Sequence, residues 1–276
     1  MNHLGIDAIH PTAPEYLTAA ALFSAPIDVG AAMQRIRDVW GEDVDPQWVS
    51  VDAAATGGLS GELLTFRLQG VQVMITPVTG QLEIDKGQLP EHHTHVAMTF
   101  YAPLAGMVEG TLAGEQELHG DNAPELMRRH RMVSAHIAYT QVADALMREP
   151  AAIGVYRHEL GVIHPPQMVQ ALAESLTSGQ APLPLWINIR LADGPTSRAR
   201  TLGLPLFGHL DVEVTGGPAL EKTAAFIENT ANYIVMGDSY LLPGQTIGVS
   251  DGSSYPVTQE ISVADGSTVI AVDVQG

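Results

Sequence analysis

The chain contains many short apolar segments that follow one another closely and are separated by turn residues. Gln69-Gly70 separates the apolar runs 63–68 and 71–75, and Asp265-Gly266 separates the last two runs. Short apolar runs joined by such pairs are typical of β-hairpins. Because the expected strands outnumber the helices and are often sequence neighbours, the pattern predicts an α+β fold. Its sheets should be mixed or antiparallel, with helices packed on one face.

Four segments instead show the apolar spacing and the end signals of helices. They are residues 29–40, a long segment beginning near Asn122, about 167–176, and about 218–229. Asp28 is the expected N-cap of the first helix, and Pro124 fits the first turn of the long one. The remaining strands are expected at residues 17–23, 82–84, 96–101, 152–156, 183–191, 210–214 and 233–236.

The length of 276 residues suits one large domain or two of ordinary size. Gly80–Ile84 and Gly208–Val212 each follow an apolar strand and a proline, which suggests two diverged α+β units. The expected division is an N-terminal extension over residues 1–16, a first unit over 17–118 and a second over 119–276. A single domain is the alternative.

The chain is strongly acidic, with 31 acidic and 13 basic residues and a formal net charge of −18. Such a surface repels nucleic acid and anionic membranes, and we expect it to bind neither. A positively charged or mixed-charge protein is the expected partner. The sequence contains no cysteine, which excludes disulfides, thiolate zinc sites and a cysteine nucleophile.

The expected location is the cytoplasm. Residues 1–16 contain no lysine or arginine and no long apolar run, so they do not resemble a signal peptide. No segment approaches the ~20 apolar residues that a membrane-spanning helix requires.

Three histidines in four positions, His92, His93 and His95, stand at the start of an apolar segment. Side chains alternate along a strand, so His93 and His95 should share one face and His92 the other. A His-x-His pair on one face is a geometry that metal sites use. With His136 as a candidate third ligand, a divalent-metal hydrolase is the alternative enzyme hypothesis. The competing expectation is that His95 is buried and hydrogen-bonded, with His92 closer to solvent.

A second cluster consists of Arg128, Arg129 and Arg131, which lie in the long predicted helix. On an acidic protein, such a cluster could bind an anionic ligand or an acidic partner segment. The alternative is the polar face of a helix, with Arg128 and Arg131 turned toward solvent and paired with carboxylates.

Catalytic and nucleotide-binding motifs are missing. The sequence has no Gly-x-Ser-x-Gly elbow, no phosphate-binding loop and no His-Glu-x-x-His. Without an assembled catalytic set, it favours a non-enzymatic protein-binding or regulatory role, of the inhibitor or immunity-protein type, and no cofactor.

Four segments together resemble an uncharacterised bacterial family, the domain-of-unknown-function family number 4261. The most characteristic is Thr201–Gly208, which is followed by Leu210–Val214; the others are His92–Val96, Ala152–Tyr156 and Leu242–Gly248. The order of the segments carries the resemblance, which extends over roughly residues 17 to 250. The resemblance implies a bacterial, cytoplasmic, mixed α+β protein, and it implies neither a reaction nor any catalytic residue.

Overall fold

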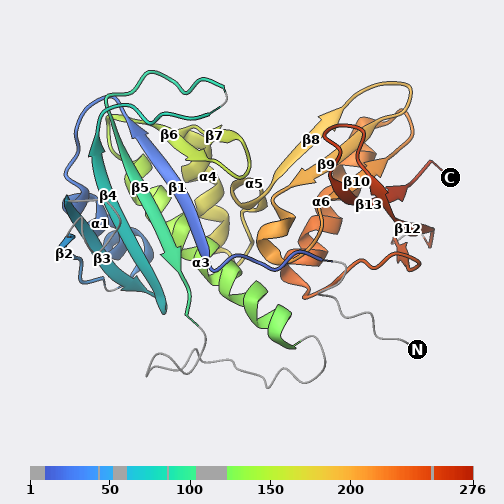
Figure 1. Ribbon diagram of the computed structural model, residues 1–276, viewed down its shortest axis with the longest axis horizontal. Coiled ribbons are helices and arrows are strands. Elements are labelled where there is room, and N and C mark those ends of the chain that lie inside the picture. The colour runs from blue at the N-terminus through green and yellow to red at the C-terminus, as the bar shows by residue number, and fades with distance from the viewer. Residues whose placement is uncertain are drawn as a thin grey trace. The chain divides into compact units, whose positions relative to one another are not determined.

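The computed structural model describes residues 10–42, 44–51, 61–85, 87–103, 123–249 and 252–275 (Figure 1). These residues form five α-helices and two β-sheets, one with seven antiparallel strands and one with six strands of mixed direction. The predicted α+β class with mixed and antiparallel sheets is confirmed. None of the described helices is long and apolar enough to cross a membrane.

The seven-stranded sheet has the strand order β2-β3-β4-β5-β1-β6-β7. Its strands are β1 (Tyr16–Phe23), β2 (Gln47–Val51), β3 (Gly61–Leu68), β4 (Val71–Thr79), β5 (Thr94–Tyr101), β6 (Ala152–Arg157) and β7 (Val162–His164). The predicted hairpin between β3 and β4 is confirmed. It turns at Gln69 and Gly70, whose φ angles of 49° and 82° are those of a tight hairpin turn.

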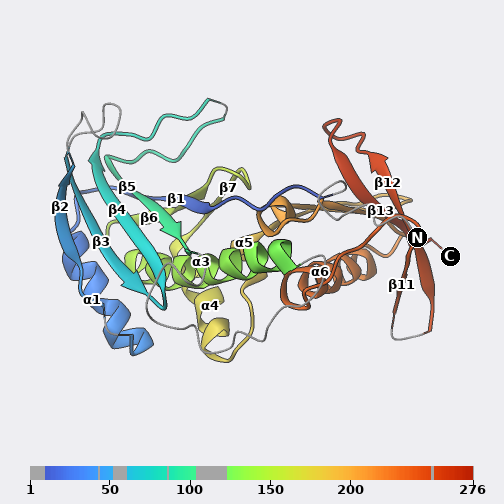
Figure 2. The ribbon, with the colours of Figure 1, turned by 60° about the horizontal axis from the view of Figure 1, so that its bottom comes forward.

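Residues that are aligned across the strands form the core face of this sheet. Phe66, Val73, Phe100 and Leu17 are neighbours in register and all are buried. Helices α1 (Val29–Trp40) and α4 (Pro166–Thr177) and most of α3 (Ala123–Met147) lie on one side of the sheet (Figure 2). The alternation of buried and exposed residues on the strands is therefore explained by helices on a single face.

The six-stranded sheet has the order β11-β12-β13-β10-β9-β8. Its strands are β8 (Asn188–Ala192), β9 (Arg198–Leu202), β10 (Val212–Thr215), β11 (Thr246–Gly248), β12 (Ser254–Ile261) and β13 (Thr268–Asp273). Among the described strands, only β10 and β13 form a parallel pair. Helix α6 (Leu220–Met236) packs against β8, β9 and β10, and a short 3₁₀ helix, η2 (Leu204–Phe207), connects β9 to β10.

Contacts divide the chain into two compact units, each built around one sheet. The seven-strand unit consists of residues 15–115 and 131–185, and the six-strand unit of residues 1–14, 116–130 and 186–276. This division differs from the expected boundary near residue 118, because the chain returns to the first sheet to add β6 and β7. The two strand orders differ, so the topology gives no support to an internal duplication.

Three expected strands are absent or altered. Residues 82–84 form no strand, and residues 183–191 begin with a helical turn, α5 (Leu183–Trp186), before β8. Residues 233–236 belong to α6, because Ile234 and Val235 continue the buried face that Ile227 and Ala231 begin. A short apolar run suits a strand or a buried helix turn equally well, so these predictions were wrong.

Candidate functional site

The histidines of residues 92–95 lie in different environments. His93 is exposed, whereas His92 and His95 are buried. Nδ1 of His92 donates to the Pro90 carbonyl at 2.7 Å, and its Nε2 accepts from the Leu82 N–H at 2.7 Å. Nδ1 of His95 donates to the Gly80 carbonyl at 3.1 Å. The buried, hydrogen-bonded His95 is confirmed, and the expectation that His92 lies nearer solvent is wrong because both of its nitrogens bond to backbone.

His136, the candidate third ligand, is fully buried in the seven-strand unit. Its Nδ1 donates to the Met132 carbonyl at 2.8 Å, and its Nε2 lies 3.4 Å from Nη2 of Arg157. Burial and the neighbouring guanidinium hold the pKa of His136 well below its usual value. The positive charge facing Nε2 opposes a bound cation. No three His, Asp or Glu residues in the described ranges are placed to hold a metal ion, so the geometry gives no support to a site using His93, His95 and His136.

The arginine cluster separates into one buried and two more accessible side chains. Arg129 is fully buried, Arg131 is partly buried, and the Arg128 side chain is 37% exposed. Nη1 of Arg128 lies 3.8 Å from a carboxylate oxygen of Glu125, three residues earlier in the helix. Such exposed pairs contribute only ~0–1 kcal/mol.

Arg129 anchors three segments of the six-strand unit. Its guanidinium donates to the backbone carbonyls of Phe207, Ile234 and Ser239, each at 2.8 Å, and lies 4.0 Å from the centre of the Tyr240 ring. Phe207 is the last residue of η2, and Ile234 lies in the last turn of α6. A buried side chain committed to these carbonyls is not accessible, so this geometry gives no support to the prediction that Arg129 binds an anionic ligand or an acidic partner segment.

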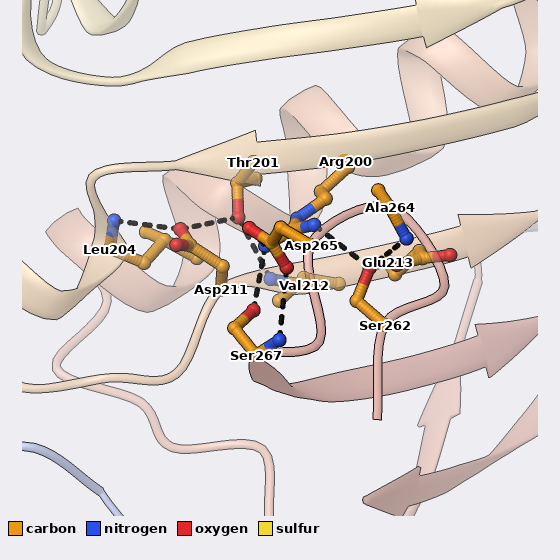
Figure 3. A network of polar contacts seen from close by, with 10 residues as sticks. All are labelled: Arg200, Thr201, Leu204, Asp211, Val212, Glu213, Ser262, Ala264, Asp265 and Ser267. Carbon is orange, nitrogen blue, oxygen red and sulfur yellow. Dashed lines mark hydrogen bonds and ion pairs between the residues drawn. The ribbon is translucent and has the colours of Figure 1, made fainter. Parts of the chain in front are cut away.

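A polar network in the six-strand unit joins β9 and β10 to the turn between β12 and β13 (Figure 3). Arg200 donates to the hydroxyls of Ser262 and Ser267 and to the carboxylate of Asp265, each at 2.8 Å. The Ser262 hydroxyl in turn donates to Glu213 at 2.7 Å. The nearby arginine and serine hold the pKa of Asp265 well below its usual range. These contacts tie the β12–β13 turn to β9 and β10, so the network indicates a structural role.

Asp211, immediately before β10, makes a second set of polar contacts, with Thr201 and Leu204 (Figure 3). Its Oδ1 accepts from the Thr201 hydroxyl and the Leu204 N–H, each at 3.1 Å. Burial raises the pKa of Asp211 to about 6, against the opposing effect of these hydrogen bonds. The carboxylate therefore holds the loop that leads into η2. Because its partners belong to that loop and to β9, its geometry indicates a structural role.

The six-strand unit has an open cleft of about 1160 Å³, which we call the α6 cleft. One wall is a row of α6 side chains at spacings of four, three and four residues: Lys222, Phe226, Asn229 and Tyr233. Residues this far apart lie on one face of a helix. The opposite wall is β11 with the neighbouring Tyr255, whose ring meets that of Phe226 edge-on at 5.8 Å.

The α6 cleft is aromatic and carries almost no charge. Tyr233, on its wall, is 53% exposed, so an apolar surface remains open to solvent there. Lys222 is the one lysine or arginine among the described residues that line the cleft, and none of them is acidic. In a chain with 31 acidic residues this lining is a distinct local environment. It can take up apolar side chains and one anionic group.

The sequence interpretation missed the α6 cleft. One signal was present: Phe226 and Tyr233 are seven residues apart, on a helix whose core face is formed by other residues such as Ile227 and Ile234. A second apolar row on a helix indicates a second contact surface. The predicted end near Asn229 placed Tyr233 outside the helix and hid the row.

Residues 200–273 match the family model described as Domain of unknown function (DUF4261). No curated protein and no solved structure matches the chain. The matched residues include the network of Figure 3 and most of the residues that line the α6 cleft.

Proposed function

We propose that the protein has a non-enzymatic, protein-binding role and that its six-strand unit, which contains the DUF4261 match, holds a segment of a partner protein in the α6 cleft. The observation that carries the proposal is the lining of this cleft. The half-buried Phe226 and the exposed Tyr233 both line the cleft. Accessible aromatic side chains supply large contact area at little cost in conformational entropy, and they are frequent binding hot spots.

The occupant that fits is an apolar peptide segment with one carboxylate. The apolar side chains would cover the exposed aromatic surface of α6. The carboxylate would pair with Lys222, which lines the cleft and is solvent-exposed. The absence of acidic residues from the described lining removes the repulsion that such a carboxylate would meet elsewhere on this chain.

Beyond the inserted segment, the net charge of −18 favours a partner with a basic or mixed-charge surface. Attraction between these surfaces would speed association and would weaken as salt is added. This combination, an apolar anchor with surrounding charge attraction, suits an inhibitor-like or regulatory protein.

The test is a selection of random nonapeptides displayed on phage against the full chain, followed by resynthesis of the best binder with a fluorescent label. Phe226→Ala and Tyr233→Ala should each weaken its binding at least about tenfold, as expected for a hot-spot aromatic side chain. Lys222→Glu should weaken binding of a peptide with a carboxylate. Tyr16→Ala is the matched control, because Tyr16 is also half exposed, at 51%, but belongs to the seven-strand unit.

Recovery of no binding peptide would contradict the proposal. Equal effects of Tyr233→Ala and Tyr16→Ala would contradict it as well, since binding would then not depend on the α6 cleft.

A further inference from the structure

The wall of the α6 cleft opposite the helix contains an edge strand. β11 stands at the end of the six-stranded sheet and pairs only with β12 among the described strands. The backbone N–H and C=O groups on the free side of an edge strand can pair with another extended chain. Five consecutive residues, 245–249, line the cleft, and they include all of β11.

The hydrogen-bond pattern shows which groups of β11 point outward. The Val257 N–H donates to the Gln245 carbonyl and the Val249 N–H to the Ser253 carbonyl, each at 2.9 Å. In an antiparallel pair, bonded residues alternate with non-bonded ones, so positions 245, 247 and 249 face β12. Thr246 and Gly248 therefore direct their N–H and C=O groups away from β12. Thr246 lies opposite Pro256, which has no N–H to offer.

We propose that the peptide in the α6 cleft binds as an added β-strand, between β11 and α6, and pairs with the main-chain groups of Thr246 and Gly248. This inference rests on the proposed function and specifies the conformation of the ligand. Backbone pairing would supply affinity that is independent of the peptide sequence. Alternate side chains would point toward Phe226 and Tyr233 on α6 and supply specificity.

The first experiment uses the labelled nonapeptide selected on the full chain and measures amide hydrogen exchange by NMR, with and without the peptide. Strand addition should slow exchange of the Thr246 and Gly248 N–H groups at least about tenfold. The Ile247 N–H, which faces β12, should change little because it is already bonded in the free protein.

The second experiment removes the outward donors. Thr246→Pro and Gly248→Pro delete one N–H each at positions that donate nothing to β12, so the sheet should persist. Each should weaken peptide binding about tenfold or more. The matched controls are Thr246→Ala and Gly248→Ala, which keep the N–H; a Cβ at Gly248 would meet only the Ser253 carbonyl oxygen, at 4.0 Å. Circular dichroism checks that all four variants remain folded.

The outcomes separate the two proposals. If Phe226→Ala abolishes binding while the proline variants bind like their alanine controls, the cleft binds a peptide but strand addition is wrong. Unchanged exchange at both Thr246 and Gly248 would overturn it in the same way, even if a proline variant failed to fold. If no peptide binds at all, the proposed function falls and this inference with it.

Discussion

Arg129 illustrates how a single charged residue can stabilise a fold without serving a partner. An arginine offers five N–H donors in a rigid plane, which suits several carbonyl oxygens that no regular element satisfies. Here the carbonyls come from η2, from the last turn of α6 and from Ser239, three residues after that helix ends. The sequence places Arg129 beside two other arginines, and only the packing distinguishes their roles.

We expect Arg129→Ala to lower the free energy of unfolding by about 3 kcal/mol or more. The reason is that three buried carbonyls would lose charge-assisted hydrogen bonds, each worth roughly 1.5–3 kcal/mol. Arg128→Ala is the control and should cost less than about 1 kcal/mol, since its side chain is partly exposed and has one long ion pair. Urea denaturation of both variants provides the measurement. Equal shifts in the midpoint would show that the buried hydrogen bonds contribute little.

At the scale of elements, the junction between β10 and α6 depends on Gly216. The Gly216 N–H donates to the Ser197 carbonyl at 2.8 Å, and the hydroxyls of Ser197 and Thr223 lie 2.6 Å apart beside it. A Cβ added at Gly216 would fall 2.0 Å from Oγ1 of Thr223. At the adjacent Gly217, an added Cβ would meet nothing within 4 Å.

Gly216→Ala should therefore destabilise the protein by about 1–3 kcal/mol, the usual cost of overpacking. Gly217→Ala should change stability by less than about 0.5 kcal/mol. Thermal unfolding followed by calorimetry can compare the two variants. If the Gly216→Ala and Gly217→Ala proteins unfold at the same temperature, the junction can move to admit a side chain at little cost in stability.

Local signals allowed much of the fold to be predicted. Residues 29–40 form a helix, with the expected N-cap: the Asp28 carboxylate accepts from the Ala31 N–H at 2.9 Å. The strand order of the seven-stranded sheet could not be predicted. In this sheet β1 lies between β5 and β6, and long stretches of chain separate it from both. Such pairing depends on tertiary packing, which apolar periodicity alone does not encode.

The candidate site was less accessible to sequence reasoning than the fold. Histidine and arginine clusters draw attention by composition, yet His92, His95 and Arg129 bond to backbone carbonyls and N–H groups. The α6 cleft depends on the outward backbone of β11 and on the length of α6. Main-chain groups carry no sequence signal, and helix ends are the least certain part of a pattern-based prediction.

At the scale of the whole molecule, buried histidines are present in both units. His10 and His209 lie in the six-strand unit, where their rings stack at 4.4 Å; His136 and His164 lie in the seven-strand unit. Burial is the main cause of their lowered pKa values, with Arg129 and Arg157 adding repulsion. The pKa falls to about 4 for His10 and His164 and to about 3 for His209.

Two effects of acid oppose each other in this protein. Protonation of carboxylates reduces the repulsion of a net charge of −18, and protonation of Asp211, whose pKa is raised to about 6, favours the folded state. Histidines that are neutral when folded act in the opposite direction. Their contribution is fully present above the unfolded pKa of about 6.5 and is lost as the pH falls toward the folded values.

The histidines should prevail, and stability should fall as the pH is lowered from about 6.5 to about 5. At pH 5 a folded pKa of about 4 or below removes on the order of 2 kcal/mol, so His10, His164 and His209 together remove a large part of the total stability of a typical domain, and His136 acts in the same direction. Urea midpoints at several pH values in this range, in constant high salt to screen surface charge, provide the measurement. Because both units contain such histidines, probes in each unit should report the loss of stability.

The His209→Phe variant should be less stable at pH 7, since the Leu241 N–H loses its acceptor at 3.0 Å, but its stability should depend less steeply on pH. A midpoint that stays constant or rises between pH 6.5 and 5 would show that relief of charge repulsion outweighs histidine protonation.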